Sequence, residues 1–290
     1  MYPTDERVRL LLDSLRTSSL LPDEIVVVDN RPYQEPLQSF ASDVSIIRSD
    51  DFWNVSRARN LGWRATKSEI ILFCDDDNTF EDDTISELIS AIREPTVGAV
   101  APVAYLGNTS TIWCAGVNRS AWTGRSFFVR DLENYSNMTT WETHDLPNMF
   151  CTRRSVLEQI NGFDEVAFPL QREDADIACR ITNAGFRTII TKKAAVHHHT
   201  GVVTSTSDEA TRFMERGGPD RVRHWARARV LFHRRHSHGI QKFLILTVVV
   251  PSWALFVIVG VVRNNKRISW KVEVCRTILE GLLNGYIMHL

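Results

Sequence analysis

The stretch EIILFCDDD at residues 69–77 decides the fold. Residues 70–74 are apolar and mostly branched, as in a strand buried on both faces of a sheet, and three aspartates follow without a break. A second run, EIVVVDN at residues 24–30, has the same form and ends in Asp29-Asn30. Ligands of open α/β sheets bind beyond the carboxyl ends of the strands, so these acidic strand ends predict a binding site at one edge of a sheet.

Segments with helical periodicity alternate with the apolar strands. The expected helices cover residues 6–20, 55–66, 85–93, 154–160 and 174–184, and the expected strands cover residues 24–28, 46–47, 69–74, 97–103 and 188–191. Residues 104–145 are rich in Asn, Thr, Ser and Trp, and we expect them to be irregular with some antiparallel strand. The alternation of strand and helix predicts an α/β sandwich with a mainly parallel sheet.

The bulk composition narrows the function classes. The chain has 290 residues, of which 43% are hydrophobic and 24% charged, which is ordinary for a protein with a folded core. A net charge of −1 argues against a dedicated nucleic-acid-binding protein. The five cysteines form no CxxC pair, which fits a reducing compartment and gives no thiolate metal site. The N-terminus lacks a basic-then-apolar signal pattern, so we expect the first 240 residues to stay in the cytoplasm.

The charges are distributed unevenly along the chain. Residues 1–211 carry 20 Lys and Arg against 31 Asp and Glu, whereas residues 212–242 carry nine basic residues against two acids. Residues 243–262 then contain no charge, and at about 1.5 Å per residue they are long enough to cross a hydrocarbon core of about 30 Å. Because both flanks are basic, this segment predicts membrane association, with a buried helix of a soluble protein as the alternative. Pro251 in its middle leaves a spanning and a re-entrant helix both open.

The acidic run after the second strand predicts a metal site. Asp75 and Asp77 flank one residue, so both carboxylates can reach one cation. Carboxylate oxygens suit Mg²⁺ or Mn²⁺, and such ions commonly bridge to substrate phosphates. The alternative is an acidic loop that caps the following helix, since residues 81–83 (EDD) continue the acidity.

A second acidic constellation, REDADIACR, occupies residues 172–180. Asp174 opens a helix, where a carboxylate is stabilised by unpaired backbone N–H groups, and capping is therefore the structural alternative. Three acids within four residues exceed what a cap requires. Crowded carboxylates raise one another's pKa, which favours one of them as a proton acceptor near neutral pH.

Together these residues resemble a known family. VVVDN (26–30), ARNLGWRATKSEIILFCDDD (58–77), NGFDE (161–165), REDADIACRITNAGF (172–186) and the histidines that follow look like the inverting family 2 glycosyltransferases of the GT-A fold. The resemblance covers about residues 2–201. The C-terminal ILEGLLNG (278–285) is similar to the membrane-proximal end of rhamnosyltransferase-like members that act on lipid-linked glycans. The implied fold is a Rossmann-like mixed sheet flanked by helices, followed by a C-terminal hydrophobic helix.

The resemblance implies how the donor and the metal are held. Asp29 is expected to contact the base or ribose of a nucleotide diphosphate sugar. Asp75 and Asp77 match the DxD motif that holds Mg²⁺ or Mn²⁺ on the diphosphate, and Asp75 is thereby also a donor contact. His198 is the expected histidine near the metal or pyrophosphate, with the neighbouring His199 as the alternative.

The resemblance also implies how the transfer proceeds. Asp174, the second acid of the Glu-Asp pair, matches the catalytic base that deprotonates the acceptor hydroxyl, and Glu173 is expected to contact substrate. Arg59 is expected to approach the diphosphate, with a surface ion pair as the alternative.

The N-terminus departs from the family pattern. Members begin with an apolar strand that leads into a Tyr-containing turn near the donor base, and here only Tyr2 resembles that turn. The strand normally lies between the strands that carry Asp29 and Asp75. We therefore expect a gap in the sheet, with either an upstream start of the natural chain or a degenerate copy as the explanation.

The sequence predicts four parts: a GT-A domain at 1–211, a basic membrane-proximal connector at 212–242, a transmembrane or re-entrant helix at 243–262 and an amphipathic tail at 263–290. The expected function is inverting, metal-dependent sugar transfer to a lipid-linked or cell-surface glycan, at the cell membrane with the catalytic domain in the cytoplasm. Expected partners are the donor, the acceptor and membrane lipids, but no nucleic acid. The alternatives are a nucleotidyltransferase and a non-catalytic, membrane-bound relative.

Overall fold

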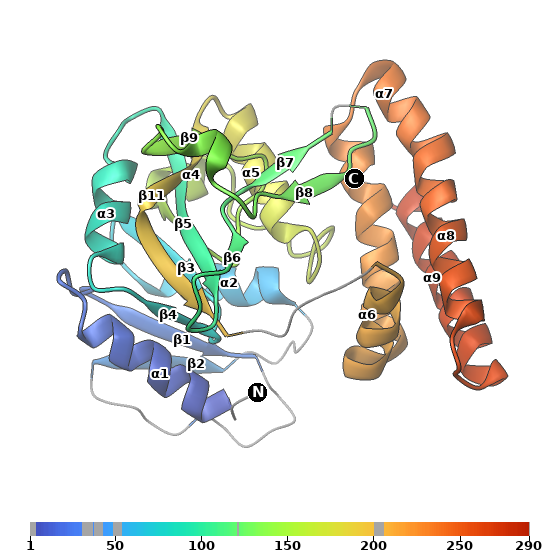
Figure 1. Cartoon of the computed structure of the whole chain (residues 1–290), viewed down its shortest axis with the longest axis horizontal. Helices are drawn as coiled ribbons and strands as arrows, with labels where there is room; N and C mark the ends of the chain where they lie inside the picture. Colours follow the sequence, from blue (N-terminus) through green and yellow to red (C-terminus); the bar gives the residue numbers. More distant parts are fainter. Residues whose placement is uncertain are drawn as a thin grey trace. The chain divides into compact units, whose positions relative to one another are not determined.

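The computed structural model describes residues 4–30, 37, 43–48, 54–120, 122–199 and 206–289 (Figure 1). Contacts within the chain divide it into two units. The first, here called the sheet unit, comprises Met1–Arg119, Ser126–Asp164 and Asp174–Thr200. The second, the helical unit, comprises Ser120–Arg125, Glu165–Glu173 and Gly201–Leu290.

The main sheet of the sheet unit has the strand order β3-β10-β5-β11-β4. These strands are β3 (Ile70–Cys74), β10 (Met149–Arg153), β5 (Val97–Leu106), β11 (Arg187–His198) and β4 (Asn78–Phe80); β6 (Ile112–Cys114) adds to β5, and β9 (Thr140–Glu142) adds to β11. Only the β5–β11 ladder of this sheet is parallel among the described strands. The expectation of a mainly parallel sheet is wrong, because β10 returns between β3 and β5 in the opposite direction. The mixed sheet implied by the family resemblance is confirmed.

Two smaller sheets accompany the main one. β1 (Ile25–Asp29) and β2 (Val44–Arg48) form a parallel pair, and β7 (Val117–Arg119) and β8 (Ser126–Phe128) form a hairpin. No described ladder joins β1 to β3, which is the terminal strand of the main sheet. Among the described strands, those that carry Asp29 and Asp75 therefore belong to separate sheets, as the expected gap between them requires.

Helices cover both faces of the main sheet. One apolar cluster joins α1 (Thr4–Arg16) and α3 (Thr84–Ile92) to the sheet through Leu12, Leu88 and Ile92. The other joins α2 (Val55–Ala65), α4 (Arg154–Gln159) and α5 (Glu173–Asn183) through Trp63, Leu157 and Ile177. A short 3₁₀ turn, η1 (Glu133–Tyr135), lies in the region expected to be irregular. Burial of one apolar face of each helix against a shared sheet defines the α/β layers.

Strand β11 is longer than the sequence pattern predicts. Residues 188–191 were the expected strand, with the histidines after it, but the strand runs to His198. Lys192 and Lys193 are exposed and interrupt the apolar pattern, and the register with β5 shifts between Thr191 and Ala195. The histidines therefore lie on a strand of the main sheet.

The helical unit contains α6 (Thr206–His236), α7 (Gly239–Leu244), the π-helical segment η2 (Ile245–Val249), α8 (Val250–Arg263) and α9 (Ile268–Ile287). The basic segment expected as a connector thus forms the long helix α6, with a break at Gly218 (φ +63°) before Pro219. In the described part of the chain, Gly239–Arg263 is the one helix long and apolar enough to cross a membrane, which is weak support for a membrane span.

Small residues bring α6 and α9 close together. A Cβ atom at Gly281 would lie 2.4 Å from the carbonyl oxygen of Arg223, and one at Gly285 would lie 2.7 Å from Cβ of Val230. This small-xxx-small spacing lets the two backbones approach, as in tightly packed helix pairs. The core of the unit is apolar and includes Val222, Ala226, Val257 and Ile278.

Candidate active site

The acidic turn between β3 and β4 is the centre of the candidate site. β3 ends at Cys74, Asp75–Asp77 form the turn, and β4 begins at Asn78. β4 pairs with the end of β11, where His198 lies opposite Asn78. As a result, Nε2 of His198 lies 3.3 Å from Oδ2 of Asp77.

Arg59 connects the acidic turn with the start of α5. Its Nη2 lies 3.3 Å from Oδ1 of Asp75, and its Nη1 lies 2.5 Å from Oδ1 of Asp174. The Arg59 side chain is only 9% exposed, so the alternative of a surface ion pair is wrong. One guanidinium holds two carboxylates that are 99 positions apart in the sequence.

Asp174 combines partial exposure with a raised pKa. It is the second residue of α5, and its side chain keeps 25% exposure, so a ligand can reach it. Burial raises the pKa of Asp174 to about 7, against the lowering effect of Arg59 and with further raising effects of Asp75 and Asp145. A carboxylate with a pKa near the working pH combines a large deprotonated fraction with useful basicity.

The carboxylates of the acidic turn have unequal acidities. Burial raises the pKa of Asp75 despite Arg59, and it raises the pKa of Asp76 to about 6 despite the ion pair with Arg7 at 2.9 Å. Burial also acts to raise the pKa of Asp77, but the hydrogen bond and the charge of His198 outweigh it and lower that pKa. Asp77 is therefore the member of the turn that stays ionised most readily.

The turn fits a divalent cation. Among the described residues, Oδ1 of Asp77 is buried without a hydrogen-bond partner, and Oδ1 of Asp75 belongs to a side chain that is 42% exposed. A buried anionic oxygen without a partner is unfavourable unless a cation or a donor completes its environment. The described residues contain no group of three or more His, Cys, Asp and Glu side chains placed to hold a metal. Asp75 and Asp77 are therefore the carboxylates of the turn that would hold such a cation.

His198 is positioned by the ring of Trp113 and by the carboxylate of Asp77. Its ring packs edge-on against Trp113 with centroids 4.2 Å apart, and its Nδ1 is buried without a partner among the described residues. The neighbouring His199 donates its backbone N–H to the carbonyl of Asp77 at 2.7 Å and contacts Oγ1 of Thr79 through Nε2 at 2.9 Å. Both histidines support the position of Asp77, and metal ligation by His198 stays a prediction.

The remaining predicted site residues lie at element ends. Asp29 ends β1, is 3% exposed and accepts a hydrogen bond from the backbone N–H of Leu37 at 3.2 Å. Glu173 is the buried first residue of α5. Tyr2 lies outside the described residues. The substrate contacts expected of these three residues stay predictions.

The sequence analysis missed a polar cluster beside Asp174. Nη2 of Arg119 lies 3.3 Å from Oδ2 of Asp145, and Nη1 donates to Sγ of Cys179 at 3.2 Å. Arg119 and Asp145 come from the region expected to be irregular, and Cys179 comes from the middle of the expected helix 174–184, so no local pattern joins them.

Asn60 was also missed. Its Nδ2 donates to the carbonyl of Phe163 at 2.9 Å, and its Oδ1 accepts from the backbone N–H of Phe163 at 3.0 Å and from Nε1 of Trp63 at 2.9 Å. The side chain fixes the NGFDE turn to the helix that carries Arg59. Its position next to Arg59 in the quoted motif was the signal that could have found it.

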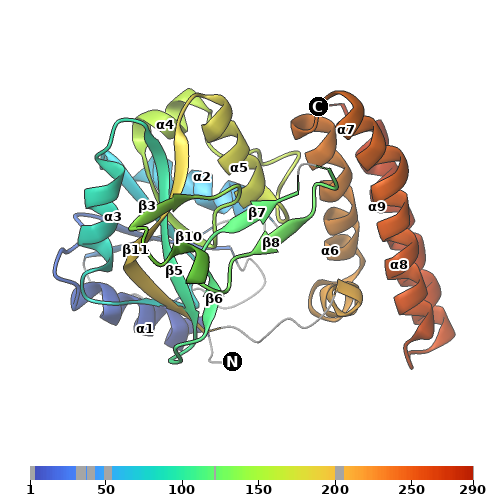
Figure 2. The same ribbon diagram turned by 45° about the horizontal axis from the view of Figure 1, so that its top comes forward.

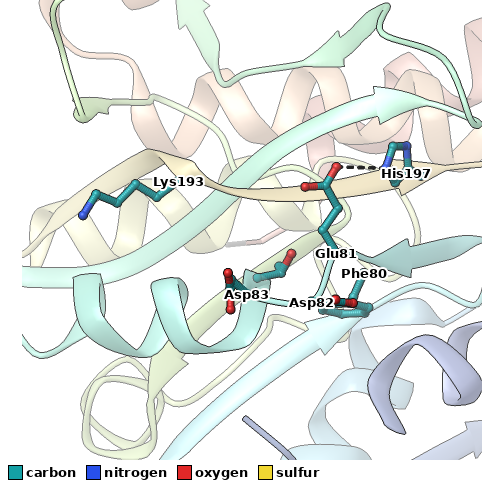
Figure 3. A pocket seen from close by; sticks show the side chains of 7 residues that line it. Phe80, Glu81, Asp82, Asp83, Lys193 and His197 are labelled. Carbon is teal, nitrogen blue, oxygen red and sulfur yellow. Dashed lines mark hydrogen bonds and ion pairs between the residues drawn. The ribbon is translucent and has the colours of Figure 1, made fainter. Parts of the chain in front are cut away.

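One hollow of the sheet unit is lined by other residues than these carboxylates (Figure 3). It has a volume of about 560 Å³ and is lined by Phe80, Glu81, Asp82, Asp83, Thr84, Lys193 and His197. Oε1 of Glu81 lies 3.1 Å from Nε2 of His197, as Figure 3 shows. The acids at 81–83 therefore belong to this hollow and are not part of the turn at 75–77.

Comparison with known proteins shows the family to which the chain belongs. Residues 2–160 match the family model described as glycosyl transferase family 2. The chain belongs to this family. The match includes Arg59 and the acidic turn of the glycosyltransferase, and it ends before Asp174.

Two curated relatives are similar to this chain in sequence. The O-antigen chain rhamnosyltransferase RfbN of Salmonella typhimurium is 27% identical over 197 residues, which are 65% of this chain and 60% of that protein. The O-antigen biosynthesis protein RfbC of Myxococcus xanthus is 27% identical over 207 residues, which are 66% of this chain and 16% of that protein. The chain therefore spans less than two thirds of the length of these relatives.

Solved glycosyltransferase structures share the fold. GalNAc-T7 with UDP, GalNAc and Mn²⁺ superposes with a TM-score of 0.56 at 14% identity, over 81% of this chain and 50% of that one. The mannosyltransferase PcManGT of Pyrobaculum calidifontis, in complex with GDP-Man and Mn²⁺, superposes with a TM-score of 0.54 at 13% identity. The superposition covers 99% of this chain and 85% of that one. The predicted fold, a mixed sheet flanked by helices and followed by an apolar C-terminal helix, is confirmed.

Proposed function

We propose that this glycosyltransferase moves a sugar from a nucleotide diphosphate sugar to an acceptor hydroxyl and inverts the anomeric configuration. The observation that carries the proposal is the contact of Arg59 with both Asp75 and Asp174. Through this contact, Asp75, which is proposed to hold the metal at the diphosphate, and Asp174, which is proposed to accept a proton, lie next to the same guanidinium.

Asp174 acts as the general base in this proposal. Its carboxylate takes the proton of the acceptor hydroxyl while that oxygen forms a bond to the anomeric carbon. The bond from the anomeric carbon to the donor phosphate breaks on the opposite face, and the nucleoside diphosphate leaves with the bonding electrons. Attack opposite the leaving group inverts the configuration, and a pKa of about 7 suits the proton transfer.

Asp75 and Asp77 would hold Mg²⁺ or Mn²⁺ in this proposal, with His198 beside them. A bound divalent cation supplies charge neutralisation for the departing diphosphate. Arg59 adds a second positive charge on the same side, since its Nη2 reaches Asp75. Asp29 at the end of β1 contacts the base or ribose, while Glu173 and Tyr2 contact substrate.

The relatives favour a glycan substrate. RfbN is a rhamnosyltransferase for the O-antigen chain, and GalNAc-T7 and PcManGT were solved with nucleotides or nucleotide sugars and Mn²⁺. By this similarity the donor of the chain is a nucleotide diphosphate sugar, and the acceptor is a lipid-linked or cell-surface glycan. The apolar helix Gly239–Arg263 supports attachment to the cell membrane. In this proposal the sheet unit lies on the cytoplasmic side.

A donor screen tests the proposal. The purified chain is incubated with a panel of UDP, GDP and dTDP sugars, with Mg²⁺ or Mn²⁺, and products are identified by mass spectrometry. Release of nucleoside diphosphate with a glycosylated acceptor supports sugar transfer. A product that keeps a nucleotide-derived phosphate would indicate a nucleotidyltransferase, and donor binding without turnover would indicate a non-catalytic relative.

A further inference from the structure

Helix α8 is apolar on all sides, but only one side is covered within the helical unit. Val250, Ala254, Val257 and Val261 form its buried stripe. Leu255 and Phe256, in the middle of the helix, are 64% and 62% exposed. A helix that is apolar all round requires a non-aqueous environment on its uncovered side as well.

Helix α9 presents a second uncovered apolar stripe. Its buried side includes Val274 and Ile278. Its exposed apolar residues recur every one or two helical turns and are more than half exposed: Ile268, Val272, Leu279, Leu283 and Ile287. Residues at such spacing share one face of a helix. The sequence pattern predicts an apolar membrane segment at residues 243–262 and an amphipathic tail at 263–290, so a lipid-facing stripe on α9 adds a second apolar surface to that segment.

The two helices form an antiparallel hairpin. α8 and α9 lie side by side in Figure 1 and Figure 2. Oη of Tyr286, near the end of α9, donates to the carbonyl of Leu246, in the π-helical segment before α8. The apolar stripes of both helices therefore belong to one paired element.

The hairpin packs along α6, which is rich in arginine. The guanidinium of Arg229 lies 4.0 Å from the ring centre of Trp253 on α8, and Arg223 pairs with Glu280 on α9 at 3.2 Å. If α8 crossed a bilayer in this bundle, these charged groups would enter the hydrocarbon core with it. Charged side chains are among the least favourable groups at that depth.

We propose that α7, α8 and α9 form a hairpin that lies in one leaflet of an anionic lipid bilayer and does not cross it. The exposed stripes of α8 and α9 contact the acyl chains, and cations at the ends of the hairpin, such as Lys242, Arg263 and Lys266, contact the headgroups. Residues 212–290 carry 14 Lys and Arg against four Asp and Glu, which complements an anionic surface. The inference rests on the proposed membrane attachment, not on the proposed chemistry.

A labelling experiment distinguishes the hairpin from a spanning helix. The full chain is added to sealed vesicles of about 70% phosphatidylcholine and 30% phosphatidylglycerol, a composition chosen for negative surface charge. Two variants, His238→Cys before α7 and Asn265→Cys between α8 and α9, are treated with a membrane-impermeant maleimide, and labelled peptides are identified by mass spectrometry. The hairpin predicts that both sites react without detergent. Labelling of Asn265→Cys only after detergent, with His238→Cys reactive throughout, would overturn the proposal.

A flotation experiment tests the contribution of α9. The double variant Leu279→Glu/Leu283→Glu should lower the vesicle-bound fraction about tenfold or more, because two exposed apolar contacts are replaced by charges. The matched control is Leu20→Glu/Leu21→Glu, which changes two exposed leucines of the sheet unit and should leave binding unchanged. Circular dichroism confirms that each variant is folded. Unchanged flotation of the α9 variant, or a stable dimer of the full chain without lipid that the α9 variant abolishes, would refute lipid as the occupant.

A second inference comes from Asn148, which directly precedes β10 in the main sheet. Met149 pairs with Cys74 in the antiparallel β10–β3 ladder, so one further step places Asn148 across from Asp75. Its Oδ1 and Nδ2 are both buried, and neither has a hydrogen-bond partner among the described residues. Buried amide groups are nearly always paired, so a completely unpaired one requires an explanation.

The chemistry of the Asn148 amide indicates which class of ligand would satisfy its hydrogen bonds. A carboxamide offers both donors and an acceptor. A phosphate oxygen only accepts and a metal ion takes only the oxygen, whereas a sugar hydroxyl both donates and accepts. We infer that Asn148 binds a hydroxyl of the transferred sugar and contributes to the choice of sugar. This inference rests on the proposed function, because the sugar follows the diphosphate expected at Asp75.

Calorimetry with two related ligands tests the role of Asn148. The nucleotide sugar found active in the donor screen and the corresponding nucleoside diphosphate are titrated into wild type, Asn148→Ala and the exposed control Asn108→Ala, with Mn²⁺ present. Asn148→Ala should bind the nucleotide sugar about tenfold more weakly and the nucleoside diphosphate equally well, the effect of one lost hydrogen bond. Its ligand-free unfolding temperature should not fall, since no hydrogen bond is lost.

Two outcomes would contradict the inference. Equal weakening for both ligands, or a lower unfolding temperature with unchanged sugar binding, would make Asn148 a structural residue. If wild type neither binds nor turns over any nucleotide sugar, the proposed function itself fails and the inference fails with it.

Discussion

Arg59 and Asp174 form a short ion pair, with Nη1 of Arg59 2.5 Å from Oδ1 of Asp174. The same guanidinium reaches Asp75 through Nη2 at 3.3 Å. One positive charge thus compensates two carboxylates with different proposed tasks. Removal of that charge should affect both stability and chemistry.

Substitution of Arg59 by Ala should lower stability and activity together. Two partly buried carboxylates would face each other uncompensated, which we expect to cost about 1–3 kcal/mol of unfolding free energy after allowance for partial exposure. Sugar transfer should fall by about 10²-fold or more, since a positive charge near the diphosphate is lost. Urea unfolding and initial rates provide the measurements. The exposed Arg57 on the same helix is the control, and an equal effect of Arg57→Ala would contradict the assignment.

Removal of the metal should abolish transfer, and Asp77→Ala should have the same effect. Asp77 provides the buried oxygen without a partner, so its loss should reduce the activity by about 10²–10⁴-fold, equivalent to several kcal/mol of leaving-group stabilisation. Rates are measured with chelator and after restoration of Mn²⁺ or Mg²⁺. Asp82 lines the separate hollow, so Asp82→Ala should stay active, and its activity should return when Mn²⁺ or Mg²⁺ is added back after chelation. Full activity of Asp77→Ala in excess chelator would exclude the metal role.

Asp174→Asn should separate chemistry from donor binding. Loss of a general base lowers turnover by about 10²–10⁴-fold, while donor affinity should change little because Asp174 serves the acceptor. Single-turnover rates and calorimetric donor binding are the two measurements. Asp176 is fully buried and bonded to Arg180 at 2.7 Å, so Asp176→Asn should instead lower stability. If Asp174→Asn keeps near-normal turnover, Asp174 is a helix cap and Glu173 becomes the candidate base.

The pH dependence should show an acidic limb near neutrality. Burial raises the pKa of Asp174 to about 7, so the carboxyl is protonated and inactive as a base at lower pH. The rate should therefore rise with pH up to about 7 and fall about tenfold for each pH unit below it. The measurement is kcat/KM from pH 5.5 to 8.5 at constant ionic strength. A flat profile over this range would show that Asp174 does not titrate as proposed.

Gly162→Ala should destabilise the sheet unit more than Gly185→Ala. Both glycines have positive φ angles, +62° and +92°, but a Cβ at Gly162 would lie 2.5 Å from Oδ1 of Asn60, whereas a Cβ at Gly185 meets nothing within 4 Å. Both substitutions carry backbone strain of about 1–2 kcal/mol, and only Gly162→Ala also displaces Asn60. Thermal unfolding of both variants measures the difference. Equal unfolding temperatures would show that the Asn60 contact contributes nothing.

Local patterns in the sequence were sufficient to predict many elements. β1, β3, α2 and α5 lie within one or two residues of the expected ranges, because each has its own apolar period and its own end signal. Asn54 caps α2 and accepts a hydrogen bond from the backbone N–H of Arg57 at 2.9 Å, which is a local start signal of this kind. The acidic strand ends that defined the candidate site follow from the same patterns.

Features that depend on distant partners were missed. The antiparallel place of β10 and the full length of β11 are set by pairing across the sheet, which no local period encodes. The contact of Arg119 with Asp145 and Cys179 joins three separate segments. The sequence pattern predicts a basic connector where α6 lies, because the many arginines make the segment look solvent-exposed. Val222, Ala226 and Val230 on this helix are nevertheless buried in the apolar core of the helical unit.

The place of β11 in the sheet also determines the order in which the newly synthesised chain can complete its structure. β4 follows the acidic turn directly, yet its ladder partner β11 is made more than a hundred residues later. Asp75 and Asp77 therefore cannot reach their final positions until residue 198 has left the ribosome, whatever the speed of the earlier helices. The apolar residues 243–262 emerge only after that point, so the sheet can close before the ribosome releases the segment that is proposed to contact lipid.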